Sequence, residues 1–178
     1  MTGATVGSGH NASVLVLFRG ESFEAADLLL TRRSRQVATH AGQVAFPGGG
    51  VEEQDGAHPV RTALRETVEE TGIPLEVIRA LGVLPHFPTV SGGFRVAPVL
   101  AMLPLEHGEV LFAPDPKEVD RISWVPVRRL RETRTTESFE VHGQQVLLPV
   151  FQWENDRMWG LTALIFDSIL HRYDSLFP

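Results

Sequence analysis

The sequence predicts an α/β fold in which a mixed β-sheet lies sandwiched between helices. Three observations support this class: strand-like and helix-like segments alternate without internal repeats, one segment is a well-bounded amphipathic helix, and 178 residues suffice for one core but not for two typical domains. We expect residues 1–12, rich in Gly, Ser and Thr, to be a flexible N-terminus and residues 13–178 to form a single domain.

Runs rich in apolar and β-branched residues mark the expected strands. In chain order these are Ser13–Phe18, Asp27–Thr31, Leu81–Leu84, Phe94–Leu103, Val119–Val125, Phe139–Val141 and Gln145–Phe151. The apolar run Gln43–Phe46 looks like a further strand, which passes into a loop at Gly48–Gly50 because consecutive glycines permit special backbone angles. Pro85–Gly93 reads as a loop, and His142-Gly143 as a turn between the last two strands.

A central helix is expected from Pro59 to a cap at Gly72. Proline suits the first helical turn, glycine suits the C-terminal cap, and Pro74 blocks continuation. On a helical projection, one arc of roughly 140° holds the residues expected to face the core, which are Val60, Ala63, Leu64, Thr67 and Val68. Val127–Arg131 reads as one helical turn and Trp159–Tyr173 as a final helix.

The opposite face of the central helix carries Glu66, Glu69 and Glu70. Their spacing of i, i+3 and i+4 places them within one arc of roughly 100°. Carboxylates this close raise one another's pKa unless a cation lies among them. A hard divalent ion, Mg²⁺ or Mn²⁺, accepts such oxygen ligands, and we expect these glutamates to hold it. The plainer interpretation is a solvated acidic face.

These residues resemble the signature of the Nudix hydrolase family, Gly-x5-Glu-x7-Arg-Glu-(apolar)-x-Glu-Glu-x-Gly-(apolar). Its second half is matched by Arg65, Glu66, Glu69, Glu70, Gly72 and Ile73, with Thr67 in the apolar position. The first half of the signature is not matched. Counting back from Arg65 at the signature's spacing gives Val51 and Ala57 at the positions of its Gly and Glu. The nearest candidates are Gly49 or Gly50 with Glu53 or Asp55, in a loop about two residues longer than the pattern.

A second resemblance points to the coenzyme A pyrophosphatases within this family. Their upstream motif reads Leu-Leu-Thr-x-Arg-Ser/Ala-x3-Arg-x3-Gly-x3-Phe-Pro-Gly-Gly, and residues 29–49 match it with one departure, Ala38 in place of the second Arg. Trp159–Ala163 is similar to the start of the final helix in the same subfamily. The resemblance implies an α/β/α sandwich that makes 13–178 one Nudix domain, and hydrolysis of coenzyme A to 4′-phosphopantetheine and 3′,5′-ADP.

The remaining candidate residues have supporting roles. Arg65 lies off the glutamate face, so we expect it to orient carboxylates during catalysis. Glu118 resembles an additional acid of the family that ligates metal or acts as base, although Asp115 competes and a solvated charge is equally consistent. Arg33 and His40 are expected to bind substrate phosphate beyond the metal site, and the backbone N–H groups of Gly48 and Gly49 to approach phosphate oxygens.

Composition limits the class of protein. The absence of Cys excludes disulfides, zinc thiolate sites and cysteine nucleophiles, and suits a reducing cytoplasm. No apolar run is long enough for a membrane span, and no signal sequence begins the chain. The net charge of −6 argues against nucleic acid as a partner. A small-molecule substrate is therefore expected, with a homodimer as an open alternative to a monomer.

We expect water to attack phosphorus in a phosphoanhydride, with Glu66 or Glu118 as general base. Two other functions stay open. Pro88 lies 15 residues beyond Ile73, as in ADP-ribose pyrophosphatases, so another nucleoside diphosphate derivative is an alternative substrate. Dinucleoside polyphosphates are disfavoured because the Tyr of that subgroup is missing after the signature and the one Tyr is Tyr173. A non-catalytic nucleotide-binding module is the second alternative, although such modules commonly lose signature glutamates that persist here.

Overall fold

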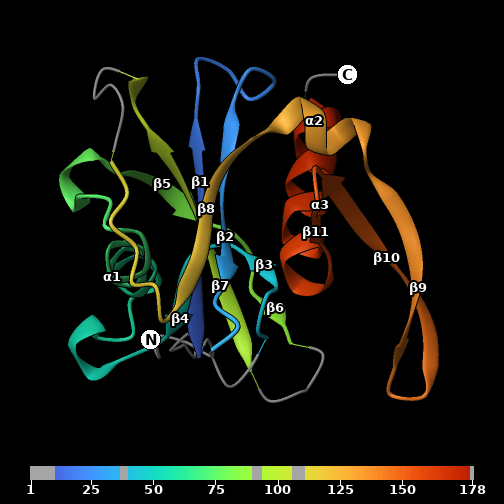
Figure 1. The fold of residues 1–178 in the computed structure, drawn as a ribbon, viewed down its shortest axis with the longest axis horizontal. Coiled ribbons are helices and arrows are strands. Elements are labelled where there is room, and N and C mark those ends of the chain that lie inside the picture. Colours follow the sequence, from blue (N-terminus) through green and yellow to red (C-terminus); the bar gives the residue numbers. More distant parts are fainter. Residues whose placement is uncertain (1–10, 37–39, 90–93, 106–110, 177–178) are drawn as a thin grey trace, which may run out of the picture.

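The protein is described by a computed structural model covering residues 11–36, 40–89, 94–105 and 111–176. Figure 1 shows a twisted sheet with helices on both faces and a β-hairpin that projects to one side. The strands of the main sheet are β1 (Ala12–Arg19), β2 (Asp27–Arg33), β3 (Val44–Ala45), β4 (Gly48–Gly50), β5 (Arg79–Val83), β6 (Phe87–Pro88), β7 (Arg95–Leu103) and β8 (Val119–Pro126). The α/β class with a mixed sheet, predicted from the sequence, is confirmed.

The main sheet has eight strands in the order β3-β2-β1-β7-β5, with β4 paired to β1, β6 to β7 and β8 to β2. The central pair β1 and β7 is parallel, and the other pairs are antiparallel. Strand β1 therefore joins the site-bearing β4 to the middle of the sheet. Its residues Leu15–Leu17 are fully buried, as expected for a strand covered on both faces.

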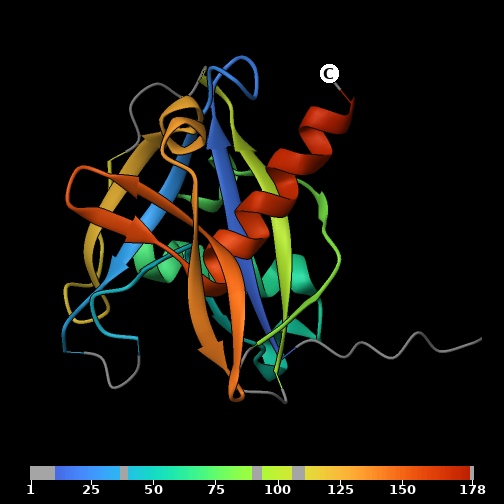
Figure 2. The ribbon, with the colours of Figure 1, turned by 90° about the vertical axis from the view of Figure 1, so that its right-hand side faces the viewer.

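Alternating residues of β1 divide the interior into two cores. Helix α1 (Pro59–Thr71) covers one face, where the buried apolar residues are Leu15, Leu17, Leu29, Ala63, Ile73, Val99, Ala101 and Leu103. Helix α3 (Gly160–Leu176) covers the other, against Val16, Phe18, Leu28 and Leu30 among others. Figure 2 shows α3 crossing the strands obliquely on its own face. The sandwich predicted for residues 13–178 is thus built from one helix on each face.

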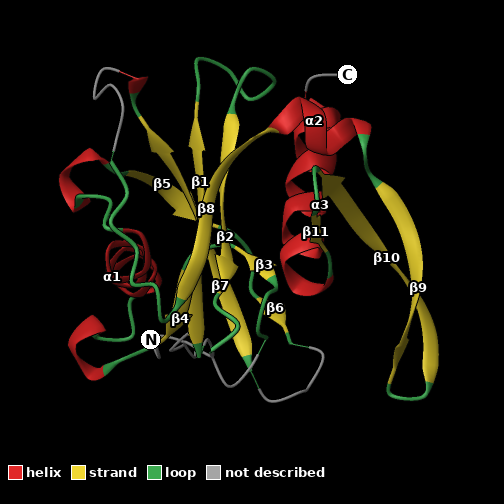
Figure 3. Ribbon diagram, viewed as in Figure 1, coloured by secondary structure: helices red, strands yellow, loops and turns green. Residues whose placement is uncertain are grey.

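A second sheet extends the α3 side of the molecule. It has the order β11-β10-β9, formed by β9 (Thr135–Val141), β10 (Gln144–Trp153) and β11 (Asp156–Met158), and it follows the short helix α2 (Val127–Glu132). Figure 3 shows the β9–β10 hairpin as the outermost part of this layer. The short strands β6 and β11 were not expected from the sequence, because two or three residues carry no readable periodicity.

Two further boundaries differ from expectation. Gly48–Gly50 is a strand and not a loop: it pairs with Ala12–Val14, and the partner strand supplies the order that three glycines lack by themselves. Pairing of Ala12 with both Gly50 and Val96 also brings the start of β1 one residue earlier than expected. The rest of the proposed flexible N-terminus, residues 1–10, lies outside the described residues. Within the described part of the chain, no helix is long and apolar enough to cross a membrane.

Candidate active site

Helix α1 approaches the sheet closely because its inner face is made of small and hydroxylated side chains. Thr62, Ala63, Thr67 and Thr71 are buried there. Two of the threonines satisfy their hydroxyls on their own helix, Thr67 donating to the carbonyl of Ala63 at 2.7 Å and Thr71 to that of Thr67 at 2.6 Å. The helix ends at Gly72, whose φ of 72° lies in the left-handed region and whose N–H donates to Val68. The predicted start and cap are confirmed, and Val60, Ala63, Leu64 and Thr67 of the expected inner face are buried or pack on the core. Val68 is only partly buried, whereas Thr62 and Thr71, which the projection did not place on that face, are fully buried.

Glu66 lies directly over Gly49. A Cβ at position 49 would come within 2.5 Å of the Glu66 carboxyl carbon, so the carboxylate occupies the space that any other residue's side chain would need. Strand β4 thus forms the floor beneath Glu66. The Glu66 side chain is 17% exposed, and its burial raises the pKa, against the lowering effect of the adjacent Arg65.

Glu70 is buried, with only 7% of its side chain exposed. One carboxylate oxygen, Oε2, accepts a 3.1 Å hydrogen bond from the Gly48 N–H, and the other lies 3.7 Å from Nη1 of Arg33. Burial raises the pKa of Glu70 to about 7, and the bond from Gly48 and the charge of Arg33 only partly offset this. The neighbouring Glu66 and Glu118 raise it further.

The three helix glutamates are therefore not equivalent, contrary to the picture of one acidic face opposite the core. Glu69 alone is well exposed, at 54%, and it accepts a 3.0 Å hydrogen bond from Nη1 of Arg65. The difference arises because β4 packs against the helix beside Glu66 and Glu70, and Arg33 at the end of β2 approaches Glu70. Helical projection describes the helix by itself and cannot include strands that pack on it.

Arg65 is the centre of an ion-pair cluster on the loop side of the helix. It bonds Asp55 through two nitrogens, donates to the Gly50 carbonyl at 2.9 Å, and pairs with Glu66 at 3.0 Å. Among the two loop acids left open by the sequence, Asp55 is the one that is buried and bound to Arg65, and Glu53 is exposed. Glu52 was not predicted as a site residue, yet its carboxylate lies 3.6 Å from the Arg65 guanidinium. The one sequence feature that could have pointed to it is its position next to Glu53.

Of the other expected site residues, Glu118 and Arg33 lie near the glutamates, and His40 has no described contact with them. Glu118 is exposed, follows the Asp115 turn, and lies close enough to affect the pKa of Glu70. Arg33 contacts Glu70 itself and so lies at the glutamate cluster, not beyond it. His40 is exposed and its Nδ1 lies 3.0 Å from the amide oxygen of Gln43, with no glutamate among its described partners. Ala38 lies outside the described residues.

The donor set can be tested against a divalent cation by its chemistry. Glu66, Glu69 and Glu70 offer only carboxylate oxygens, which hard cations prefer. Burial raises the pKa of Glu66 and of Glu70 despite the nearby arginines, so a bound cation would stabilise their charged forms. These residues fit Mg²⁺ or Mn²⁺ in type. Among the described residues no group of three or more acids or histidines already converges on one point, and two of the three glutamates are paired with Arg65.

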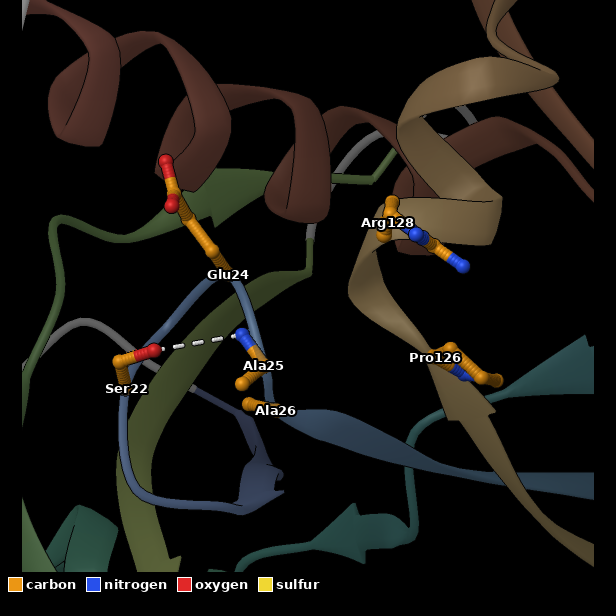
Figure 4. A pocket seen from close by; sticks show the side chains of 6 residues that line it. All are labelled: Ser22, Glu24, Ala25, Ala26, Pro126 and Arg128. Carbon is orange, nitrogen blue, oxygen red and sulfur yellow. Dashed lines mark hydrogen bonds between the residues drawn. The ribbon is translucent and has the colours of Figure 1, made fainter.

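Two hollows of the described surface lie away from the glutamates. One of about 430 Å³ lies between the β1–β2 turn and α2, lined by Ser22, Glu24, Ala25, Ala26, Pro126 and Arg128 (Figure 4). A second, of about 320 Å³, lies on the other side of Pro126 and includes Trp153. Neither contains any residue of the glutamate cluster. The candidate site is instead formed by side chains of α1 together with β4 and the end of β2.

Comparisons with known proteins agree with this arrangement. The model of the NUDIX domain matches residues 9–143. The chain is 38% identical over 144 residues to the Nudix hydrolase NudL of Pectobacterium atrosepticum, covering 80% of this chain and 72% of that protein. The NudL protein of Photorhabdus laumondii is equally similar, at 38% over 144 residues, covering 80% and 74%.

The same fold is found in solved structures. RenU, a Nudix hydrolase from M. Smegmatis, aligns with a TM-score of 0.62 at 17% identity and covers 96% of this chain and 88% of that one. A MutT/nudix family protein from Enterococcus faecalis aligns with a TM-score of 0.59 at 19% identity, over 93% and 62% of the chains. At these identities the likeness concerns the fold alone, whereas the domain match and the NudL relatives define the family. The chain belongs to the Nudix hydrolase family.

Proposed function

We propose that the protein is a metal-dependent pyrophosphatase that hydrolyses coenzyme A or its derivatives to 4′-phosphopantetheine and 3′,5′-ADP. One observation carries the proposal. Arg33 and Gly48, both from the upstream segment that resembles coenzyme A pyrophosphatases, contact the same carboxylate, Glu70. The substrate-specific segment and the glutamate helix therefore share one site.

Glu66, Glu69 and Glu70 would hold Mg²⁺ or Mn²⁺, which supplies charge neutralisation at the pyrophosphate and acidifies a bound water. Arg33, at the edge of this cluster, would neutralise a phosphate oxygen of the substrate. The Gly48 N–H, expected from the sequence to approach a phosphate oxygen, donates instead to Glu70 and so positions that carboxylate. Gly49 pairs with Ser13 of β1 and supplies the space that the Glu66 carboxylate fills. Water then attacks phosphorus, and Glu66 or Glu118 takes its proton.

Arg65 has a positioning role in this mechanism. Its contacts with Asp55 and the Gly50 carbonyl anchor it to the loop, and its contacts with Glu66 and Glu69 set the starting positions of two carboxylates. Phosphoryl transfer demands positioning and electrostatic stabilisation more than covalent help, so a fixed arginine at this place serves the reaction without touching the substrate.

An ADP-ribose or related nucleoside diphosphate hydrolase is the second candidate. The spacing of Pro88 from Ile73 suggests this activity. Pro88 lies in β6, which pairs with the edge of β7 opposite to β1, and it has no described contact with the glutamates. A non-catalytic nucleotide-binding module is the third candidate. A cytoplasmic location and a homodimeric state are further parts of the proposal.

A substrate panel tests the proposal. Purified protein with Mg²⁺ or Mn²⁺ is incubated with coenzyme A, dephospho-coenzyme A, ADP-ribose, NADH and a dinucleoside polyphosphate, and products are separated by chromatography. Coenzyme A should give the highest kcat/KM and two phosphorylated products, all turnover should stop with a chelator, and reaction in ¹⁸O-water should label a phosphate product. A clear preference for ADP-ribose would replace the substrate but keep the mechanism. No turnover of any member would favour the binding module.

A further inference from the structure

Ser13 is a fully buried polar residue whose hydroxyl has no hydrogen-bond partner. It lies on β1 next to the active-site strand, and its exposed fraction is 0%. Buried hydroxyls are nearly always paired, and each unpaired one needs a physical explanation. The other hydroxyls beneath helix α1 do not share this property, because Thr62, Thr67 and Thr71 all donate hydrogen bonds.

The strand register places Ser13 beside Glu66. Ser13 is paired with Gly49 on one side and with Ala97 on the other. It lies two residues before Leu15, so its side chain points to the same face of the sheet, toward α1. The Cβ atoms of directly opposed residues are about 4.5–5.5 Å apart. The Cβ position of Gly49 is filled by the Glu66 carboxylate, so the Ser13 hydroxyl and that carboxylate are neighbours.

In the present arrangement Glu66 is engaged elsewhere. Its Oε1 lies 3.0 Å from Nη2 of Arg65, and its Oε2 also lies over Gly49. The two residues paired with Ser13 across the sheet, Gly49 and Ala97, have no side-chain hydrogen-bond acceptor. The acceptor nearest to it by strand register is the Glu66 carboxylate, which lies over Gly49.

We propose that Ser13 is a positioning residue for metal binding: its hydroxyl donates to the Glu66 carboxylate when that carboxylate turns from Arg65 toward the divalent ion. This inference rests on the proposed function. One Glu66 oxygen is then free for the ion while the other is held by Ser13. The unpaired hydroxyl is thus preorganised for the metal-loaded state and is left unsatisfied in the metal-free one.

Ser13→Ala should weaken Mn²⁺ binding without destabilising the metal-free protein. Removal of an unpaired buried hydroxyl leaves the metal-free protein as stable as the wild type or more so, so its Tm in chelator stays equal or rises. Loss of a hydrogen bond to a charged group weakens Mn²⁺ binding about tenfold. Free Mn²⁺ is measured by electron paramagnetic resonance, which reports binding independently of turnover. Ser123→Ala, a partly buried serine on β8 facing the other core, is the matched control and should leave both values unchanged.

The outcomes separate this inference from the function on which it rests. Failure of the wild type to bind Mn²⁺ overturns the proposed metal-dependent function. Wild-type binding with an unchanged Mn²⁺ affinity in Ser13→Ala overturns the role of Ser13 alone. A Tm that falls by several degrees in chelator, or a variant that does not fold, shows that the hydroxyl is already paired in the metal-free protein and also overturns it.

A double-mutant cycle identifies the partner. If Ser13 acts through Glu66, Ser13→Ala should have no further effect on Mn²⁺ affinity in a Glu66→Gln background. The same tenfold loss in both backgrounds would exclude Glu66 as the acceptor and overturn the assignment. Ser13→Thr, which retains the hydroxyl, should bind Mn²⁺ more tightly than Ser13→Ala, and equal weakening in the two variants also contradicts the proposal.

Discussion

Arg65 holds Asp55 by two parallel hydrogen bonds, Nε to Oδ1 and Nη2 to Oδ2, each 3.1 Å long. Asp55 also accepts bonds from the Thr62 hydroxyl at 3.0 Å and the Glu52 N–H at 2.9 Å. These contacts hold the pKa of Asp55 at about 2, chiefly through Arg65, and Asp55 in turn holds the pKa of Arg65 above its usual range. The loop from β4 to α1 is thereby tied to the helix that carries the glutamates.

Asp55→Asn should lower the free energy of unfolding at pH 7 by about 3–5 kcal/mol, the usual effect of removing one partner from a buried pair. The pKa of Asp55 in the folded state, about 2, is below its ordinary value of 3.8, so the stabilisation is fully present above pH 4 and is lost as pH falls through about 2. The difference between variant and wild type should therefore shrink over that range, measured by urea unfolding. Glu53→Gln, an exposed neighbour, is the control. A constant difference from pH 7 to pH 2 would assign the effect to packing.

Glu70→Gln and Glu69→Gln should each lower kcat by roughly two orders of magnitude or more, as expected for groups that organise the charge of the transition state. Their effects on stability in chelator should differ. Burial disfavours the charged form of Glu70, so its neutral amide should leave the metal-free protein equally or more stable. Glu69 is mostly exposed, and its change should stay within about 0.5 kcal/mol. Near-normal turnover in either variant would remove that residue from the site.

Gly49→Ala should reduce kcat/KM at least tenfold with little loss of Tm. A methyl group at this position overlaps the Glu66 carboxylate, which is the far end of a flexible side chain and can move aside. The strand pairing of Gly49 with Ser13 does not depend on the missing side chain. Gly82→Ala is the matched control, since its Cβ would meet nothing within 4 Å. If both variants retain full activity, the position of Glu66 over Gly49 is not required for catalysis.

Arg33→Ala should weaken turnover of coenzyme A and of dephospho-coenzyme A to a similar extent, by about 1.5–3 kcal/mol in kcat/KM. The reason is its position: the guanidinium lies 3.7 Å from Glu70, where the pyrophosphate shared by both substrates would bind. Steady-state kinetics on the two substrates measures the ratio. A loss confined to coenzyme A would instead place Arg33 on the 3′-phosphate, beyond the metal site, as the sequence analysis expected of its phosphate contact.

Local sequence patterns accounted for the parts of the site that lie within one element. The start at Pro59, the cap at Gly72 and the i, i+3, i+4 spacing of the glutamates all follow from residues close in sequence, and the structure has the same helix. The ambiguous loop acid could not be resolved in this way. Glu53 and Asp55 are equally acidic in sequence, and only the fold turns Asp55 inward to Arg65 and Thr62.

The sequence by itself determined the α/β class, the helix that carries the carboxylates and the family to which they belong, because helical periodicity, capping and motif spacing act over a few residues. The tertiary structure decided which carboxylate is buried, which strand lies beneath Glu66 and which arginine meets Glu70. Those relationships join β1, β2, β4 and α1 across 17 to 37 residues, and they arise from strand register and packing. Charge and burial at each glutamate depend on neighbours that only the folded chain brings together.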